Sequence, residues 1–245
     1  MKERIYTIPI NEAFEKECEC PVCLFEKDEE QKLLDYTLGA SMMEPDARLI
    51  TNEKGFCKHH YLKLMDMTEK LPLALVTETH MDEILKTLKE FDKKIPDAQK
   101  KLFKKSDALK DELKKQTEYF DELNKKCAIC ERHNHIMDVF MKNLIFLIKT
   151  EPDFYNKFFS SKGFCIKHFN EILKYAAEDL SGEVLYKFVK DLYKLEIENF
   201  ARVDEDVKWF TKKFDYRFKD EPWKNSKDAV KRSTEKIVSY SYKDE

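Results

Sequence analysis

Cys20-Pro-Val-Cys23 followed by Gly55-Phe56-Cys57-Lys58-His59-His60 decides the fold of this 245-residue chain, because the same pattern returns further along. The second copy reads Cys127-Ala-Ile-Cys130 and Gly163-Phe164-Cys165-Ile166-Lys167-His168, displaced by 107 and then 108 residues. Between the motifs, Glu44-Pro45-Asp46 also returns as Glu151-Pro152-Asp153. This self-similarity predicts two related structural units.

Each copy of the pattern offers three sulfurs and one imidazole nitrogen, a donor set that suits tetrahedral zinc. The predicted ligands are Cys20, Cys23, Cys57 and His60 in the first half, and Cys127, Cys130, Cys165 and His168 in the second. A Cys-x2-Cys pair at a helix start aims both sulfurs at one point, and residues three apart on a helix share a face. The expectation is one structural Zn²⁺ in each half, two per chain.

The repeat also separates ligands from their neighbours. His59 aligns with Lys167, whereas His60 aligns with His168, so His60 is the expected ligand. Cys18 aligns with Lys125 and is expected to be a spare thiol. The other histidines, expected at the solvated surface, are His80, His133 and His135.

Alternatives to zinc remain open at this level. Three cysteines and one histidine can hold an iron–sulfur cluster, although zinc is preferred here. Reversible thiol–disulfide chemistry would leave both histidines without a role, and buried free cysteines would not explain the paired spacings.

Composition and periodicity predict an all-α fold. The chain has only four glycines and seven prolines among 42% apolar residues. Apolar residues recur at helical spacing along most of the chain, and no alternating strand pattern is convincing. The expected architecture is an internally duplicated helical bundle with long amphipathic helices, each half stapled by a Cys3His metal site. The expected domains are 1–95 and 96–220, followed by a polar C-terminal tail, 221–245.

Several function classes lack support in the sequence. There is no phosphate-binding glycine loop, no H-E-x-x-H and no nucleophile elbow, so nothing indicates an enzyme. The net charge of −3 and the acidic residues within the Lys-rich stretches 93–105 and 224–236 leave only a weak case for nucleic-acid binding. The N-terminus has no apolar signal region and no segment is long enough to span a membrane, so a cytoplasmic protein without membrane contact is expected.

The tail carries the remaining specific pattern, Asp215-Tyr216-Arg217, then Pro222-Trp223 and Asp228-Ala229. Its aromatic groups would dock the C-terminus onto the bundle or contact a partner. Together with Cys20-Pro-Val-Cys23-Leu24 and the two Gly-Phe-Cys-x2-His motifs, the tail resembles a family of uncharacterised bacterial proteins of about this length. That family is filed as a domain of unknown function, and some members carry transport-related names. The resemblance implies ligand roles for the same eight residues and supplies no activity.

These observations favour a zinc-stabilised helical binding or scaffold protein that acts through a protein partner. An iron–sulfur or thiol-based redox protein is the first alternative, and a nucleic-acid-binding protein is the second.

Overall fold

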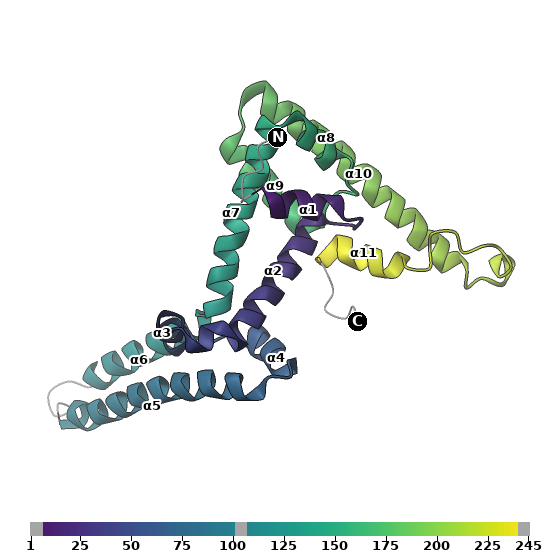
Figure 1. Ribbon diagram of the computed structural model, residues 1–245. Coiled ribbons are helices and arrows are strands. Elements are labelled where there is room, and N and C mark those ends of the chain that lie inside the picture. The colour runs from purple at the N-terminus through teal and green to yellow at the C-terminus, as the bar shows by residue number, and fades with distance from the viewer. Residues whose placement is uncertain (1–6, 101–106, 240–245) are drawn as a thin grey trace. The chain divides into compact units, whose positions relative to one another are not determined.

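The computed structural model describes residues 7–100 and 107–239, with side chains from 7–95 and 109–239. Every regular element in that part of the chain is helical, which confirms the all-α prediction (Figure 1). The elements are α1 (Ile8–Glu15), α2 (Pro21–Leu38), η1 (Ala40–Met43), α3 (Pro45–Lys54), α4 (Lys58–Asp66), α5 (Lys70–Lys100), α6 (Asp107–Lys125), α7 (Ala128–Thr150), α8 (Pro152–Phe159), α9 (Ile166–Asp179), α10 (Gly182–Lys212), η2 (Tyr216–Phe218) and α11 (Ala229–Val238). None of these helices combines the length and the apolar character that crossing a membrane requires.

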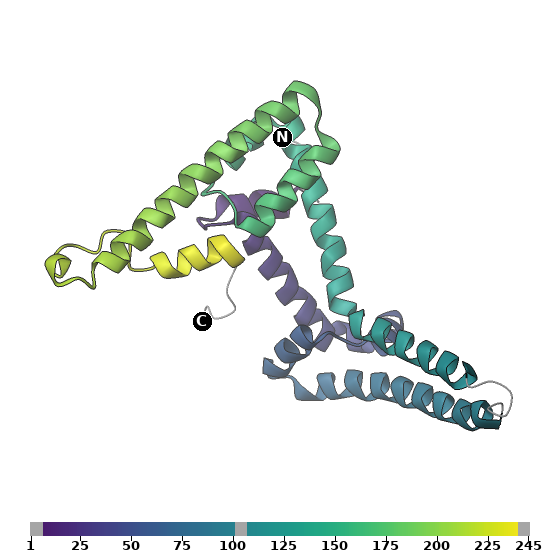
Figure 2. The same ribbon diagram turned by 180° about the vertical axis from the view of Figure 1, so that it is seen from behind.

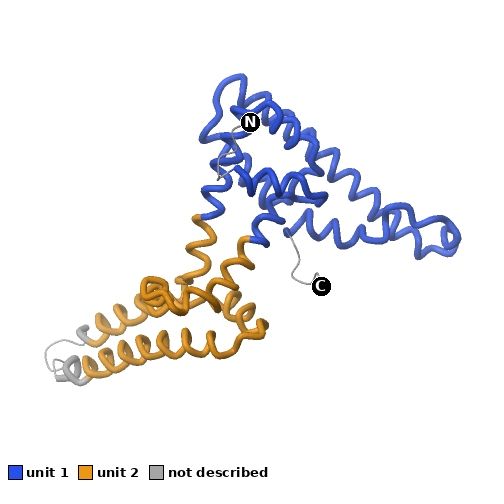
Figure 3. The backbone as a smooth tube through the Cα atoms, in the orientation of Figure 1, with its two compact units in different colours: residues 1–28, 136–245 blue, residues 29–135 orange. Residues whose placement is uncertain are grey.

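The chain divides into two compact units that do not follow the predicted boundaries. Residues 1–28 and 136–245 form unit 1, and residues 29–135 form unit 2 (Figure 3). Both boundaries fall inside long helices, α2 and α7. This division differs from the expected one at residue 96, because each unit combines segments from both sequence halves.

The repeated motifs begin and end helices in the same way in both units. Glu44 and Glu151 precede a proline at the first turn of α3 and α8, where its missing N–H costs nothing. Gly55 and Gly163 then take positive φ values of 57° and 77°, which a glycine tolerates. The next cysteine of each motif is the N-cap of the following helix.

Aromatic side chains fill the core of unit 1. Phe158 is fully buried, and its ring centroid lies 5.5 Å from that of Phe14, 5.0 Å from Phe164 and 5.9 Å from Phe188. These rings come from α8, α1, the segment before α9, and α10. Their burial therefore joins four parts of the chain.

Long helices also dominate unit 2, where α5 and α6 pack against each other as a hairpin that both views show (Figure 2). Helix α3 packs on α5. His80 of α5 lies beside Gly55, and its Nδ1 donates to the Asn52 carbonyl at 2.7 Å. His80 is 8% exposed, so the expectation of a solvated residue was wrong. Its ring fills the space beside Gly55, where an added Cβ would lie 2.3 Å from Nε2.

The C-terminal tail docks within unit 1. Trp209 Nε1 of α10 donates to the Pro222 carbonyl at 2.9 Å, and the Trp223 ring lies 5.7 Å from that of Phe210. Tyr216, by contrast, is 86% exposed. Helix α11 then returns along α10 to α9. The docking interpretation of the tail thus fits Pro222 and Trp223 but not Tyr216.

Lys236 anchors α11. Its side chain is 1% exposed, and its ammonium donates to the carbonyls of Glu19 (3.0 Å), Phe164 (3.4 Å) and Lys162. These carbonyls belong to the two loops that lead into Cys20 and Cys165. The end of α11 also places Ser239 Oγ 3.0 Å from Cys23 Sγ. Helix α11 and Ser239 are therefore part of the structure around these cysteines.

Lys236→Met is expected to destabilise the protein by about 3 kcal/mol, because it leaves buried carbonyls without this donor and removes one of the cations beside the Glu19 carboxylate, which keeps Arg202 at 2.6 Å. Urea unfolding measured by circular dichroism would show the loss. The matched control is Lys231→Met on the same helix, where the lysine side chain is 52% exposed. Equal stability of the two variants would contradict the anchoring role.

Candidate metal centres

Four donor residues meet in the interior of unit 1. Cys20, Cys23, Cys165 and His168 form what we call the buried cluster, in which every residue is at most 2% exposed. Cys23 Sγ lies 3.5 Å from Cys165 Sγ and 3.2 Å from His168 Nδ1. His168 Nδ1 also lies 3.3 Å from Cys165 Sγ and 3.5 Å from Cys20 Sγ.

Unit 2 contains a second cluster of the same composition. Cys57, His60, Cys127 and Cys130 form the half-buried cluster, named for the partial exposure of Cys57 and Cys130. His60 Nδ1 lies 3.3 Å from each of the three sulfurs. The sulfurs of Cys57 and Cys130 are 3.7 Å apart.

The structure brings together all eight residues predicted as ligands, but the predicted pairing within each sequence half was wrong. Cys20 and Cys23 meet Cys165 and His168, while Cys57 and His60 meet Cys127 and Cys130. Each cluster thus takes its Cys-x2-Cys pair from one copy of the motif and its Cys-x2-His pair from the other. The two copies offer identical donor types, so the motif alone does not distinguish the two pairings.

Both donor sets fit a single tetrahedral ion. Zinc with Zn–S bonds of about 2.3 Å and a Zn–N bond of about 2.0 Å places its donor atoms about 3.5 to 3.8 Å apart. The donor separations given above run from 3.2 to 3.7 Å, and every pair of donor atoms within a cluster lies within 4.8 Å. In each cluster the histidine presents Nδ1 to the three sulfurs. Each cluster could therefore hold a metal ion.

Backbone N–H groups at the helix starts contact the sulfurs that would bind the metal ion. The backbone N–H of Cys23 points to Cys20 Sγ at 3.5 Å, that of Cys130 to Cys127 Sγ at 3.4 Å, and that of His168 to Cys165 Sγ at 3.5 Å. N–H groups in the first helical turn have no partner within the helix, so they are free to stabilise thiolates. This is the physical reason that the Cys-x2-Cys spacing recurs at helix starts.

The electrostatics of both clusters favour a central positive charge. Burial lowers the pKa of His168, but contacts with Cys165, Cys23 and Glu26 outweigh it and raise that pKa to about 11. For His60, burial likewise lowers the pKa, and Cys127 and Glu30 raise it to about 10. A position that stabilises an imidazolium so strongly is surrounded by negative charge. The same negative charge would stabilise a bound metal cation.

A carboxylate supports each histidine from the side opposite the sulfurs, which sequence reasoning missed. Glu26 Oε2 lies 3.2 Å from His168 Nε2, and Glu30 Oε1 lies 3.2 Å from His60 Nε2. Burial raises the pKa of Glu26, but His168 and Lys167 outweigh it and lower the value to about 2. Metal-binding histidines commonly donate their second N–H to such a carboxylate. His60 Nε2 is hydrogen-bonded to Glu30 in this way, whereas His168 Nε2 contacts Glu26 without forming a hydrogen bond. Only Glu26 could have been suspected from sequence, since it lies three residues after Cys23 on one helix.

Glu30→Gln is expected to weaken metal binding at the half-buried cluster by about 10- to 100-fold, because the histidine loses the charge that raises its basicity. Titration with a chromophoric chelator would measure the change. Asp35→Asn, an exposed carboxylate on the same helix, is the matched control. Unchanged affinity in the Glu30 variant would contradict the supporting role.

The remaining cysteine and histidines lie outside the two clusters. Cys18 is half-buried, and burial is the main cause that raises its pKa to about 11, which disfavours its thiolate. His59 contacts Glu30 at 3.0 Å, so Glu30, His59 and His60 form a further group with donor atoms close together. The ring of His59 faces Glu30 and takes no place among the donors of the half-buried cluster.

Comparison with protein families gives one match across the chain. The model described as a family of unknown function, DUF6062, matches residues 1–244. The chain belongs to this family. Membership agrees with the resemblance seen in the cysteine motifs and the tail, and it assigns no activity. Searches of the curated proteins and of the solved structures found no match.

Proposed function

We propose that the protein is a zinc-stabilised helical scaffold, in which two structural Zn²⁺ ions hold helix ends in place and the helices present a surface to a protein partner. The observation that carries the proposal is the geometry of the donors, all four of which lie within 4.8 Å of one another in each cluster. Four protein ligands leave no open coordination position, which is the pattern of structural rather than catalytic zinc.

Compactness also favours one ion over an iron–sulfur cluster. A multinuclear cluster spreads its ligands over several iron atoms, whereas donors that all lie within 4.8 Å of one another fit around a single ion. Among the described residues all the cysteines are free thiols. Thiols that bind metal persist in a reducing compartment, which supports our proposal of a cytoplasmic location.

A stripe on α10 supports the binding role. Tyr186, Tyr193 and Ile197 recur at helical spacing and are 69%, 47% and 65% exposed. The buried residues of the same helix, among them Phe188 and Leu192, lie on the other face. Exposed tyrosines are enriched where proteins bind one another, so this stripe is the proposed contact surface.

The deciding experiment is elemental analysis of the full chain purified without added metal. Two zinc ions per chain in a colourless protein would support the proposal. Iron with acid-labile sulfide and broad visible absorbance would replace it with the redox alternative. A metal-free protein that retains its full stability in chelator would overturn both.

The contact surface is tested separately with a Tyr186→Ser and Ile197→Ser double variant. Its zinc content and melting temperature should match those of the wild type, because both side chains are exposed. Crosslinking in the native host should identify one protein that is captured by the wild type and lost in the variant. The same capture by both proteins would exclude this stripe as the contact.

A further inference from the structure

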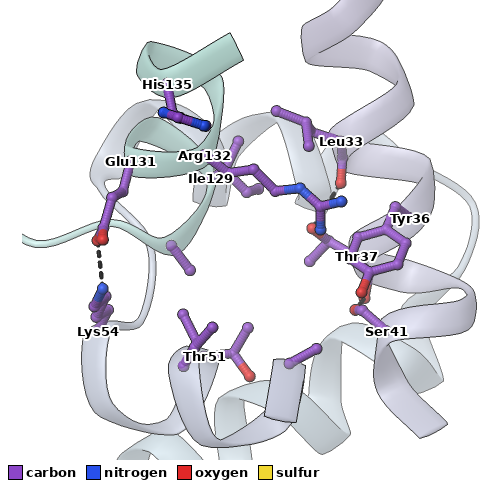
Figure 4. A pocket seen from close by; sticks show the side chains of 13 residues that line it. Leu33, Tyr36, Thr37, Ser41, Thr51, Lys54, Ile129, Glu131, Arg132 and His135 are labelled. Atoms are coloured by element: carbon purple, nitrogen blue, oxygen red, sulfur yellow. Dashed lines mark hydrogen bonds and ion pairs between the residues drawn. The ribbon is translucent and has the colours of Figure 1, made fainter. Parts of the chain in front are cut away.

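A pocket opens beside the half-buried cluster, within residues 29–135. Its volume is about 420 Å³, and its walls come from α2, α3 and the first turns of α7 (Figure 4). Ala128 and Ile129, which lie between the two cysteines of the Cys-x2-Cys pair, form part of the lining. The volume falls in the lower range of small-molecule sites.

The motif repeat supplies an internal comparison for this pocket. Every lining position has a counterpart 107 residues away in the chain, within unit 1, and six of these counterparts are large apolar side chains of the unit 1 core. The pairs are Leu33 with Phe140, Thr37 with Leu144, Ser41 with Ile148, Ala47 with Phe154, Thr51 with Phe158, and Arg132 with Phe25.

All six counterparts are buried apolar side chains, between 0% and 8% exposed. The rings of Phe25 and Phe140 stack with centroids 4.0 Å apart. At four of these positions unit 2 has a small or hydroxylated side chain (Thr37, Ser41, Ala47 and Thr51), where unit 1 has a phenyl or branched aliphatic group. The space left open in unit 2 has the chemistry of an aromatic or branched apolar group.

The hydroxyls along the pocket are already engaged. Thr37 Oγ1 donates to the Leu33 carbonyl at 2.7 Å, Ser41 Oγ to the Thr37 carbonyl at 3.0 Å, and Thr51 Oγ1 to the Arg48 carbonyl at 3.1 Å. These bonds run back along their own helices. The walls consequently offer methyl and methylene groups and few free donors.

Arg132 is the charged group left to meet a ligand. Figure 4 shows its side chain reaching from α7 toward Tyr36 and Thr37, with the Lys54–Glu131 ion pair on the opposite side. Its guanidinium lies 4.5 Å from the centre of the Tyr36 ring, and it forms no ion pair with any residue in the described part of the chain. Lys54 is already balanced by Glu131, so one positive charge remains at the pocket. A guanidinium binds a carboxylate through two parallel hydrogen bonds.

We propose that this pocket binds a small monocarboxylic acid with an aromatic or branched apolar body. The apolar body would occupy the space in unit 2 that corresponds to the positions of Phe154, Phe158 and their neighbours in unit 1. The carboxylate would pair with Arg132. This inference is independent of the proposed scaffold role, because the pocket would bind the acid whichever ion the clusters hold.

The test uses the full chain and 3-phenylpropionate as the probe, with 3-phenylpropionamide as its neutral analogue. Isothermal titration should show binding of the acid at sub-millimolar concentration and binding of the amide about 10-fold weaker, the loss expected for a charge-assisted pair. In isoleucine-methyl NMR spectra the shifts should centre on Ile129 and Ile50, which line the pocket. Absence of binding at millimolar acid, or shifts that centre elsewhere, would overturn the proposal.

Two variants separate the apolar body from the charge. Ala47→Phe installs the unit 1 residue and should abolish binding of both probes while two equivalents of metal are retained. Arg132→Gln should weaken binding of the acid by about 10-fold and leave the affinity for the amide unchanged. Arg217→Gln, which changes an exposed arginine in η2, is the matched control. If Ala47→Phe fails to fold, the Arg132→Gln variant still tests the proposal, because Arg132 is exposed and its replacement should not disturb folding. A ratio of acid to amide affinity equal to that of the wild type would contradict the pairing of the carboxylate with Arg132.

Discussion

Replacing Cys165 by serine is expected to make Cys20 and Cys23 reactive and to leave Cys127 and Cys130 protected. The reason is that each cluster joins the Cys-x2-Cys pair of one motif copy to the Cys-x2-His pair of the other, which we call the crossed pairing. In the buried cluster Cys23 Sγ accordingly lies 3.5 Å from Cys165 Sγ. A pairing within each half would give the opposite result, because Cys165 would then share an ion with Cys127 and Cys130. Alkylation followed by peptide mass spectrometry distinguishes the two.

This variant should also cause the largest loss of stability. A structural zinc contributes on the order of 10 kcal/mol to folding, and the buried cluster joins the start of α2 to the start of α9. We expect one metal ion to be lost per chain and the native helical signal to fall. The mirror variant, Cys130→Ser, should expose Cys57 while Cys20 and Cys23 stay protected. Reactivity at Cys127 in the Cys165 variant, with Cys20 unreactive, would disprove the crossed pairing.

Phe158→Ala is expected to destabilise the protein by about 4 kcal/mol, the range for removing a fully buried phenyl group and leaving a cavity. Phe158 is 0% exposed and contacts rings from α1, from α10 and from the segment before α9. Urea unfolding followed by circular dichroism measures the change.

Phe214→Ala is the control for that measurement, since Phe214 is 75% exposed and its truncation leaves no cavity. Its free energy of unfolding should stay within about 0.5 kcal/mol of the wild type, as for most surface substitutions. A loss below about 1 kcal/mol in the Phe158 variant would mean that the aromatic core is not what holds these segments together.

Local chemistry was readable from the sequence because it acts over a few residues. Proline favours the first turn of a helix, and α3 and α8 begin at Pro45 and Pro152. Gly55 and Gly163 predict backbone turns, and both have positive φ. The donor types and spacings in turn identified the eight residues that form the two clusters.

The choice of partners for each cysteine pair depended on forces that the motif does not contain. Pairing Cys23 with Cys57 closes a loop of 34 residues, and pairing it with Cys165 closes one of 142. Loop-closure entropy favours the shorter loop by only about 1 kcal/mol, since it grows with the logarithm of length. Packing of the phenylalanine core, where one ring alone contributes several times that amount, outweighs this preference.

The starts of α3 and α8 and the identity of the ligands were thus determined by the sequence, because each depends on the chemistry of near neighbours. The tertiary structure decided which Cys-x2-Cys pair meets which Cys-x2-His pair, and it placed Glu26 and Glu30 beside the histidines. It also decided that unit 2 has a pocket at positions that large apolar side chains occupy in unit 1. These features depend on which buried surfaces of distant segments fit together, and spacing along the chain carries almost no free energy with which to choose among them.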